Sequence, residues 1–120
     1  MLTFPAALEV FICTNPTDMR KSFDSLASLT REVLNQNPLS GHLFVFFNRR
    51  RNLVKTLYWD KHGYCIFIKR LEKGTFHLYD WNNTSHSSYV TDPKELSLIL
   101  DGVDLSGAKR RQRFEFNING

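Results

Sequence analysis

The chain has 120 residues, a formal net charge of +4, 42% hydrophobic residues and 13% aromatic residues. A domain of this length hides roughly two-thirds of the surface that its unfolded chain exposes. The ten Phe residues argue against a disordered or collagen-like chain. No apolar run approaches the ~20 residues of a membrane-spanning helix, and the first residues do not resemble a secretion signal. We therefore expect one domain over residues 1–120 that is cytoplasmic and makes no membrane contact.

The positive charge is concentrated in two segments. Residues 49–73 contain eight Lys or Arg against two acids, and the C-terminal end carries Lys109, Arg110, Arg111 and Arg113. Clustered cations are the electrostatic footprint of a surface that binds a polyanion. Charge runs are also common in solvated loops that only aid solubility. The clustering therefore favours a nucleic-acid role, with a solvated surface as the alternative.

The first third of the chain predicts a strand and a helix. Residues 8–13 form a short apolar run that ends at Asn15 and Pro16, where proline disfavours further sheet pairing. Thr17 or Asp18 can then cap a helix that runs to about residue 34. Apolar residues at three- and four-residue steps give this helix one stripe that can face a core. The stripe consists of Met19, Phe23, Leu26, Thr30 and Val33.

The middle of the chain predicts an antiparallel meander. Residues 43–47, 53–59, 64–69 and 75–79 have the character of strands, and four or five residues connect each to the next. Parallel neighbours need a crossover of a dozen or more residues, so connections this short indicate antiparallel pairing. The segment 60–63, which ends in glycine, is typical of a hairpin turn.

The last third of the chain predicts a loop, a helix and a tail. Residues 80–88 are polar and are expected to form a surface loop. Asp92 as a capping acid, Pro93 at the first helical position and Glu95 predict a helix start, and Gly102 lies where that helix would end. A basic tail follows at about residues 107–120. The expected fold class is α+β, a small antiparallel β-meander sheet with two helices that cover one face.

The sequence offers little to a catalyst or a metal ion. Cys13 and Cys65 lie in apolar surroundings, and no CxxC pair occurs. They are most simply small buried hydrophobes, with a disulfide between them left open. A glycine-rich phosphate loop, a GxSxG elbow and an HExxH pair are all missing, and the four histidines never form an adjacent pair. We therefore expect no enzymatic activity, no metal and no cofactor.

The run Arg49, Arg50, Arg51 is the sharpest feature of the sequence. Adjacent guanidinium groups repel one another and contribute nothing to folding, and an ordinary turn here would carry Gly, Asn or Asp. Their planar, multi-donor groups suit phosphate oxygens. The run therefore favours a phosphate-binding hairpin over a turn whose charge only aids solubility.

Further cations extend this hypothesis. Arg20 and Lys21 fall in the expected first turn of the helix, where the helix dipole disfavours cations by about 0.3–1 kcal/mol. Asp24 could offset much of that cost as an ordinary surface partner. Lys69 and Arg70, with the tail, are consistent with more phosphate contacts. The candidate nucleic-acid-binding residues are Arg20, Lys21, Arg49, Arg50, Arg51, Lys55, Lys69, Arg70, Lys109, Arg110, Arg111 and Arg113.

The abundant aromatic residues indicate which partner to expect. Aromatic residues in strands more often fill a core than stack on bases. An exposed row of them beside the arginines would favour single-stranded nucleic acid, whose bases stack on aromatic side chains. Buried aromatic residues would favour duplex backbone or protein.

An ordered series of motifs runs through most of the chain. It comprises DMRKSFDSL at residues 18–26, PLSGHLFVF at 38–46, NRRR at 48–51, LYWD at 57–60 and KRLEKGTF at 69–76. This series resembles the accessory proteins encoded by bacterial insertion sequences of the sixty-six type, often called TnpB or Orf-two-like. Members of that family usually show Trp-Pro shortly after the last Phe, whereas FHLY occupies residues 76–79 here.

The resemblance implies a protein made beside a separate transposase and assisting transposition. It does not imply the much longer RNA-guided nuclease that shares the TnpB name, and it supplies no catalytic residue. Two functions of different class follow. One is a non-catalytic DNA-binding accessory factor that grips backbone phosphates through the basic hairpin and tail. The alternative is an adaptor that docks on the transposase of the same element without contacting nucleic acid.

Overall fold

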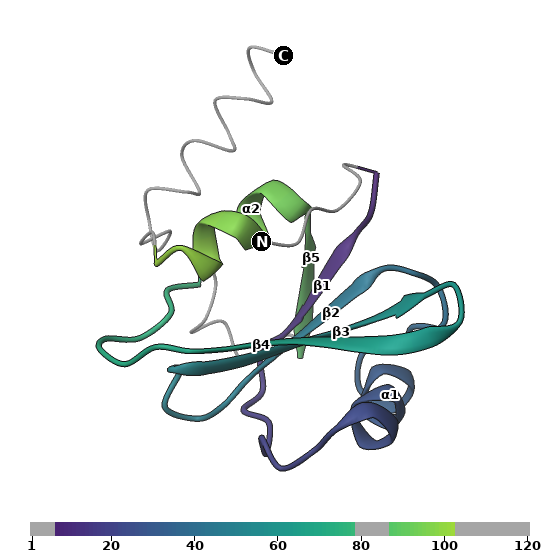
Figure 1. The fold of residues 1–120 in the computed structure, drawn as a ribbon, viewed down its shortest axis with the longest axis horizontal. Helices are drawn as coiled ribbons and strands as arrows, with labels where there is room; N and C mark the ends of the chain where they lie inside the picture. Colours follow the sequence, from purple (N-terminus) through teal and green to yellow (C-terminus); the bar gives the residue numbers. More distant parts are fainter. Residues whose placement is uncertain (1–6, 79–86, 103–120) are drawn as a thin grey trace.

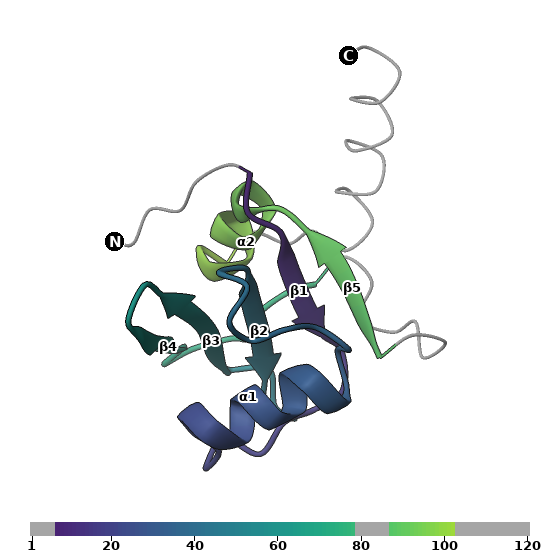
Figure 2. The same ribbon diagram turned by 90° about the vertical axis from the view of Figure 1, so that its right-hand side faces the viewer.

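Five strands form one mixed sheet between two helices in the computed structural model, which describes residues 7–78 and 87–102. The elements in chain order are β1 (Val10–Cys13), α1 (Phe23–Glu32), β2 (Leu43–Phe47), β3 (Leu53–Asp60), β4 (Gly63–Arg70), β5 (Ser88–Thr91) and α2 (Pro93–Leu100). The strand order across the sheet is β4-β3-β2-β1-β5 (Figure 2). The α+β fold class is confirmed. The basic tail expected at 107–120 lies outside the described residues.

The predicted meander is confirmed for β2, β3 and β4, which pair antiparallel in that order. A further strand at residues 75–79 is wrong for the part that the structure describes, since residues 75–78 form no strand. Phe76 and Leu78 are nevertheless buried in the core. The backbone N–H of Phe76 donates to the carbonyl of Arg51 at 2.7 Å. Burial does alternate over residues 75–78, but the backbone bonds to a loop instead of to a strand.

The sheet is not antiparallel throughout. β1 pairs parallel with β2 and antiparallel with β5. The parallel pair is possible because α1 lies between β1 and β2 in the chain and serves as the crossover. β5 was not predicted: it has four residues and follows directly on a polar segment, so its pattern is too short to show a period. Of the expected loop at residues 80–88, only its last two residues are described, and Ser88 already belongs to β5.

The two helices cover opposite faces of the sheet, so the expectation that both cover one face is wrong (Figure 1). Phe44 and Phe46 of β2 pack in the cluster with α1. Val45 and Phe47 pack in the cluster with α2. All residues of β1 and β2 are buried. Strands covered on both faces need apolar residues at every position, which explains their uninterrupted apolar sequences.

α1 begins later than expected. Its N-cap is Ser22, whose N–H donates to Oγ of Ser25 at 2.9 Å, so the expected cap at Thr17 or Asp18 is wrong. The N–H of Thr17 instead donates to the carbonyl of Phe47 at 2.8 Å, which ties this segment to the end of β2. Tertiary contacts therefore replace the first turn that the local sequence could have formed.

The prediction for α2 is confirmed. Oδ1 of Asp92 accepts from the N–H of Glu95 at 2.8 Å, Pro93 occupies the first helical position, and Gly102 adopts a φ of +84° just after the helix. Neither helix of the described part is long and apolar enough to cross a membrane.

Both cysteines are free. Cys13 packs in the α1 cluster, whereas Cys65 lies opposite Tyr58, which packs on the α2 cluster.

Candidate nucleic-acid interface

Two asparagines fix the loop that carries the three arginines. Oδ1 of Asn48 accepts from the N–H groups of Asn52 and Leu53, both at 3.0 Å. Nδ2 of Asn48 donates to Oδ1 of Asn52 at 2.6 Å. The N–H of Arg51 donates to the carbonyl of Asn48 at 3.1 Å and closes the turn. Asparagine is suited to this position because its side chain can bond to the backbone a few residues ahead.

The backbone of Arg51 and Asn52 bonds the loop to residues 71–76, the segment that follows β4. Its φ of +61° is left-handed, a conformation that costs a residue other than glycine about 1–2 kcal/mol. The carbonyls of Arg51 and Asn52 accept from the N–H groups of Phe76 and Leu71, both at 2.7 Å. Partial burial lowers the pKa of the Arg51 guanidinium. The backbone of the loop is therefore fixed on two sides.

Arg49 and Arg50 occupy the tip of this fixed loop. Both side chains are exposed. Neither arginine forms an ion pair with another residue of the described part of the chain. A pair of solvated guanidinium groups on a fixed backbone is available to an anionic partner at little cost in backbone entropy.

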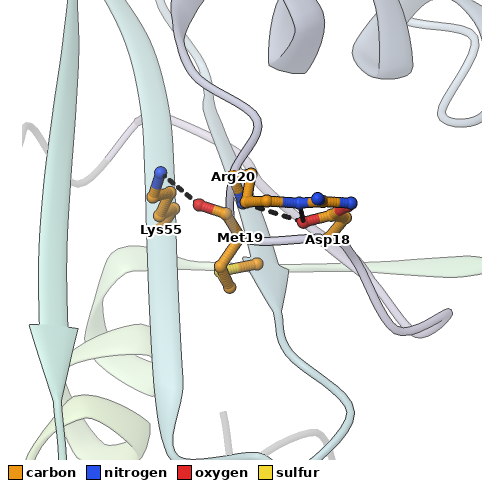
Figure 3. Close-up of polar contacts among 4 residues, drawn as sticks. All are labelled: Asp18, Met19, Arg20 and Lys55. Carbon is orange, nitrogen blue, oxygen red and sulfur yellow. Dashed lines mark hydrogen bonds and ion pairs between the residues drawn. The ribbon is translucent and has the colours of Figure 1, made fainter.

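A lysine of β3 brings a second cationic segment to the same end of the sheet. Nζ of Lys55 donates to the carbonyl of Met19 at 2.8 Å (Figure 3). It also donates to the carbonyl of Lys21 at 2.7 Å. These bonds tie the segment just before α1 to β3, and α1 begins after that segment, with Ser22 as its N-cap. The ammonium of Lys55 thus has two protein partners, and its contact with phosphate remains a hypothesis.

Arg20 is paired with a different acid from the one expected. Its guanidinium binds the carboxylate of Asp18, with Nη2 at 2.7 Å from Oδ2 (Figure 3). This pairing holds the pKa of Asp18 at about 2. Arg20 and Lys21 precede the helix instead of lying in its first turn, so the expected helix-dipole cost and the role of Asp24 in offsetting it do not apply.

Lys69 and Arg70 point to opposite faces of β4 because successive residues of a strand alternate. Nζ of Lys69 donates to the carbonyl of Leu100 at 2.6 Å, at the C-terminal end of α2. Cations often bond the last carbonyls of a helix in this way. Arg70 lies opposite Leu53, and its Nε donates to Oε2 of Glu72 at 2.9 Å.

The structure thus gathers six of the eight predicted cations that it describes at one end of the sheet, where β2 and β4 end and β3 begins. We call this surface the basic end. Lys69 lies on the other face, and Lys55 is at this end with its ammonium bonded. The four cations of the tail lie outside the described residues. The basic end comprises Arg20, Lys21, Arg49, Arg50, Arg51, Arg70 and Lys73.

Asn48 and Asn52 were missed as site residues, although their places on either side of the arginine run are a readable turn signal. Replacing Asn48 with alanine removes three hydrogen bonds of the loop. We expect Asn48→Ala to lower the free energy of unfolding by about 1–3 kcal/mol, as for other lost bonds to partly buried groups. Urea unfolding measures this loss. A change below 0.5 kcal/mol would show that the asparagine does not fix the loop.

The described residues hold no group of three or more His, Cys, Asp or Glu side chains that could bind a metal ion.

A family model described as IS66 Orf2 like protein matches residues 8–110. The Sinorhizobium fredii protein y4hO is 41% identical over 104 residues, which span 87% of this chain and 88% of the relative. A second protein of that organism, y4jC, is 30% identical over 104 residues, 87% of this chain and 86% of the relative. No solved structure matches the chain.

Proposed function

Since the chain belongs to the IS66 Orf2-like family of insertion-sequence accessory proteins, we propose that it binds DNA backbone phosphates through its basic end. The role is non-catalytic: the protein holds element DNA for the separate transposase and needs no reacting group of its own. The basic tail, with Lys109, Arg110, Arg111 and Arg113, would add phosphate contacts.

The observation that carries this proposal is the fixed arginine loop. A merely solvated turn has no need for a left-handed arginine between two asparagines that lock the backbone. Locking the loop lowers the entropy that binding must pay, because the arginine backbone is already ordered. Arg49 and Arg50 are exposed at its tip. Guanidinium groups presented in this way match phosphate oxygens in charge and in geometry.

The burial of the aromatic residues favours duplex DNA over single strands. Phe44, Phe46, Phe47 and Phe76 are at most 1% exposed, so they offer no stacking platform beside the arginines. Phe23 is the one described aromatic side chain among the exposed large hydrophobic residues. A single ring does not make the succession of stacking surfaces that single-strand binders use. The supported partner is therefore the phosphate backbone of a duplex.

Binding to labelled duplex and single-stranded DNA over a salt series tests the proposed function. Each neutralised phosphate releases about one counterion, so the logarithm of the affinity should fall linearly with the logarithm of the salt concentration. We expect duplex binding with a slope of about −1.8 or steeper, which is about −0.9 for each of the two exposed arginines at the loop tip. Binding that is undetectable at low ionic strength, or insensitive to salt, would contradict the proposal.

A second candidate function is docking on the transposase encoded by the same element. It is supported by two arginines of the basic end that already bind carboxylates, Arg20 with Asp18 and Arg70 with Glu72. An acidic protein surface could be recognised by the same chemistry. Trypsin cleavage at residues 49–51 distinguishes the two: DNA protects the loop if the first function holds, and the transposase alone protects it if the second does.

A further inference from the structure

The structure leaves a long strand open at one edge of the sheet. β4 pairs with β3 through all eight of its residues, and no strand of the described residues pairs with its other side. We propose that β4 pairs antiparallel with β4 of a second copy of this chain, so that two sheets join into one. The proposed partner is another copy because the open backbone groups and the side chains of β4 match those of a second, antiparallel β4.

The backbone groups available at this edge can be identified. The N–H of Leu71 donates to the carbonyl of Asn52, which continues the register in which Arg70 lies opposite Leu53. Because hydrogen-bonded and non-bonded pairs alternate in an antiparallel ladder, every second residue back from Leu71 also bonds to β3. The intervening residues turn their N–H and C=O groups to the open edge. They are Tyr64, Ile66, Ile68 and Arg70.

If a two-fold axis passes through the sheet at Ile66, the two β4 strands pair antiparallel with apolar residues opposite apolar residues. Ile66 then lies opposite Ile66 of the second copy, and Tyr64 lies opposite Ile68, which is 55% exposed in the single chain. On the other face Cys65 lies opposite Phe67, and Lys69 lies opposite Gly63. Every apolar residue thus meets an apolar residue, and the two Lys69-Arg70 pairs lie at opposite ends, where their like charges are separated. A parallel arrangement would set these charges side by side.

β4 also lacks the devices that keep edge strands of monomers apart. Such strands are usually short, or interrupted by proline, bulges or charges. β4 has eight residues in continuous register with β3, no proline, and charges only at its last two positions. The other edge of the sheet is different: β5 has four residues, and Pro93 follows it closely.

Pairing through β4 has a consequence for DNA, which rests on the proposed function. Arg70 is four residues from the axis, so the basic ends of the two copies would lie roughly 27 Å apart along the strands, at about 3.4 Å per residue. Dimeric DNA-binding proteins often contact sites about one helical turn, roughly 34 Å, apart. At roughly 27 Å the two basic ends would lie somewhat less than one helical turn apart, within the length of one duplex. Dimer formation itself is measured without DNA, so it can fail while the DNA-binding function holds.

Cysteine cross-linking tests the proposed register in the full chain, with Cys65→Ala as background. In Ile66→Cys the two thiols face each other at a Cα separation of about 5.5 Å, within the range of a disulfide. In the control Ile68→Cys the two residues are four positions apart, roughly 14 Å. With an added oxidant we expect at least tenfold more covalent dimer from Ile66→Cys than from Ile68→Cys. Equal yields, or none from either variant, would overturn the proposal.

Sedimentation equilibrium of the uncross-linked protein gives an independent test. Ile68→Pro removes an N–H that faces the open edge and leaves the bonds to β3 in place, whereas Ile68→Val keeps that N–H. We expect the wild type and Ile68→Val to dimerise, and Ile68→Pro to dissociate with a constant at least tenfold higher. A monomeric wild type at 100 μM (about a hundredfold above a micromolar dissociation constant) would overturn the proposal. If circular dichroism shows that Ile68→Pro is unfolded, the cross-linking pair decides.

Discussion

Replacing both Arg49 and Arg50 with alanine is expected to weaken duplex binding by about a hundredfold at low salt and to lower the salt slope by about 1.8. The slope follows from the loss of two phosphate contacts, at about 0.9 counterion for each contact on B-form DNA. The affinity follows from about 1.5 kcal/mol, roughly a factor of ten, for each charged hydrogen bond, which is the lower end of its range. Fluorescence polarisation over the salt series measures both quantities. The free energy of unfolding should stay within about 0.5 kcal/mol, because both side chains are exposed.

A matched control removes the same charge elsewhere. Arg31, in the last turn of α1, and Lys94, in the first turn of α2, are exposed and do not belong to the basic end. The double variant Arg31→Ala and Lys94→Ala should leave the salt slope within about 0.5 of the wild type. If both double variants lose affinity equally, binding depends on net charge alone and the loop is not the contact surface.

Replacing Lys55 with methionine is expected to lower the free energy of unfolding by about 2–4 kcal/mol. Methionine keeps most of the apolar stem, but the carbonyls of Met19 and Lys21 lose their charged donor. Hydrogen bonds to charged groups contribute about 1.5–3 kcal/mol each, and one ammonium shared by two acceptors gives less than twice that. Such a loss is a large part of the 5–15 kcal/mol that stabilises an ordinary domain. Denaturant unfolding followed by Trp fluorescence measures it.

Lys73→Met is the control for this variant, since it removes the same charge from an exposed position of the basic end. Its unfolding free energy should change by no more than about 0.5 kcal/mol. A loss below 1 kcal/mol for Lys55→Met would mean that the two hydrogen bonds contribute little, and would return Lys55 to the candidates for phosphate contact. A lower salt slope in a folded Lys55→Met would support the same conclusion.

Elements set by neighbouring residues could be predicted from the sequence. The strands of the meander are apolar segments separated by short polar connections. The hairpin turn at 60–63 forms where the sequence has polar residues followed by glycine. The start of α2 depends only on Asp92, Pro93 and Glu95, which are adjacent in the chain. The arginine loop was recognisable for the same reason, because its cations and its two asparagines lie within five residues.

Elements set by distant residues could not be predicted in this way. α1 starts at Phe23, after a segment whose carbonyls are bonded to the ammonium of Lys55 in β3, 34 and 36 positions away. β5 forms because β1 offers it an open edge. The two helices lie on opposite faces because β1 and β2 are apolar on both. Each of these outcomes depends on a contact with a distant part of the chain, which the local sequence pattern does not reveal.

The amino-acid sequence by itself determined the α+β class, the meander, the second helix and the family, since these depend on periodicity, capping and ordered motifs. Only the tertiary structure decided which cations are available to a partner. Lys55, Lys69, Arg20 and Arg70 look alike in the sequence, yet the ammonium groups of Lys55 and Lys69 are bonded to carbonyls that folding brings to them, whereas Arg20 and Arg70 pair with carboxylates only two residues away. Charge is a property of a residue, whereas its availability depends on what the fold places within hydrogen-bond distance.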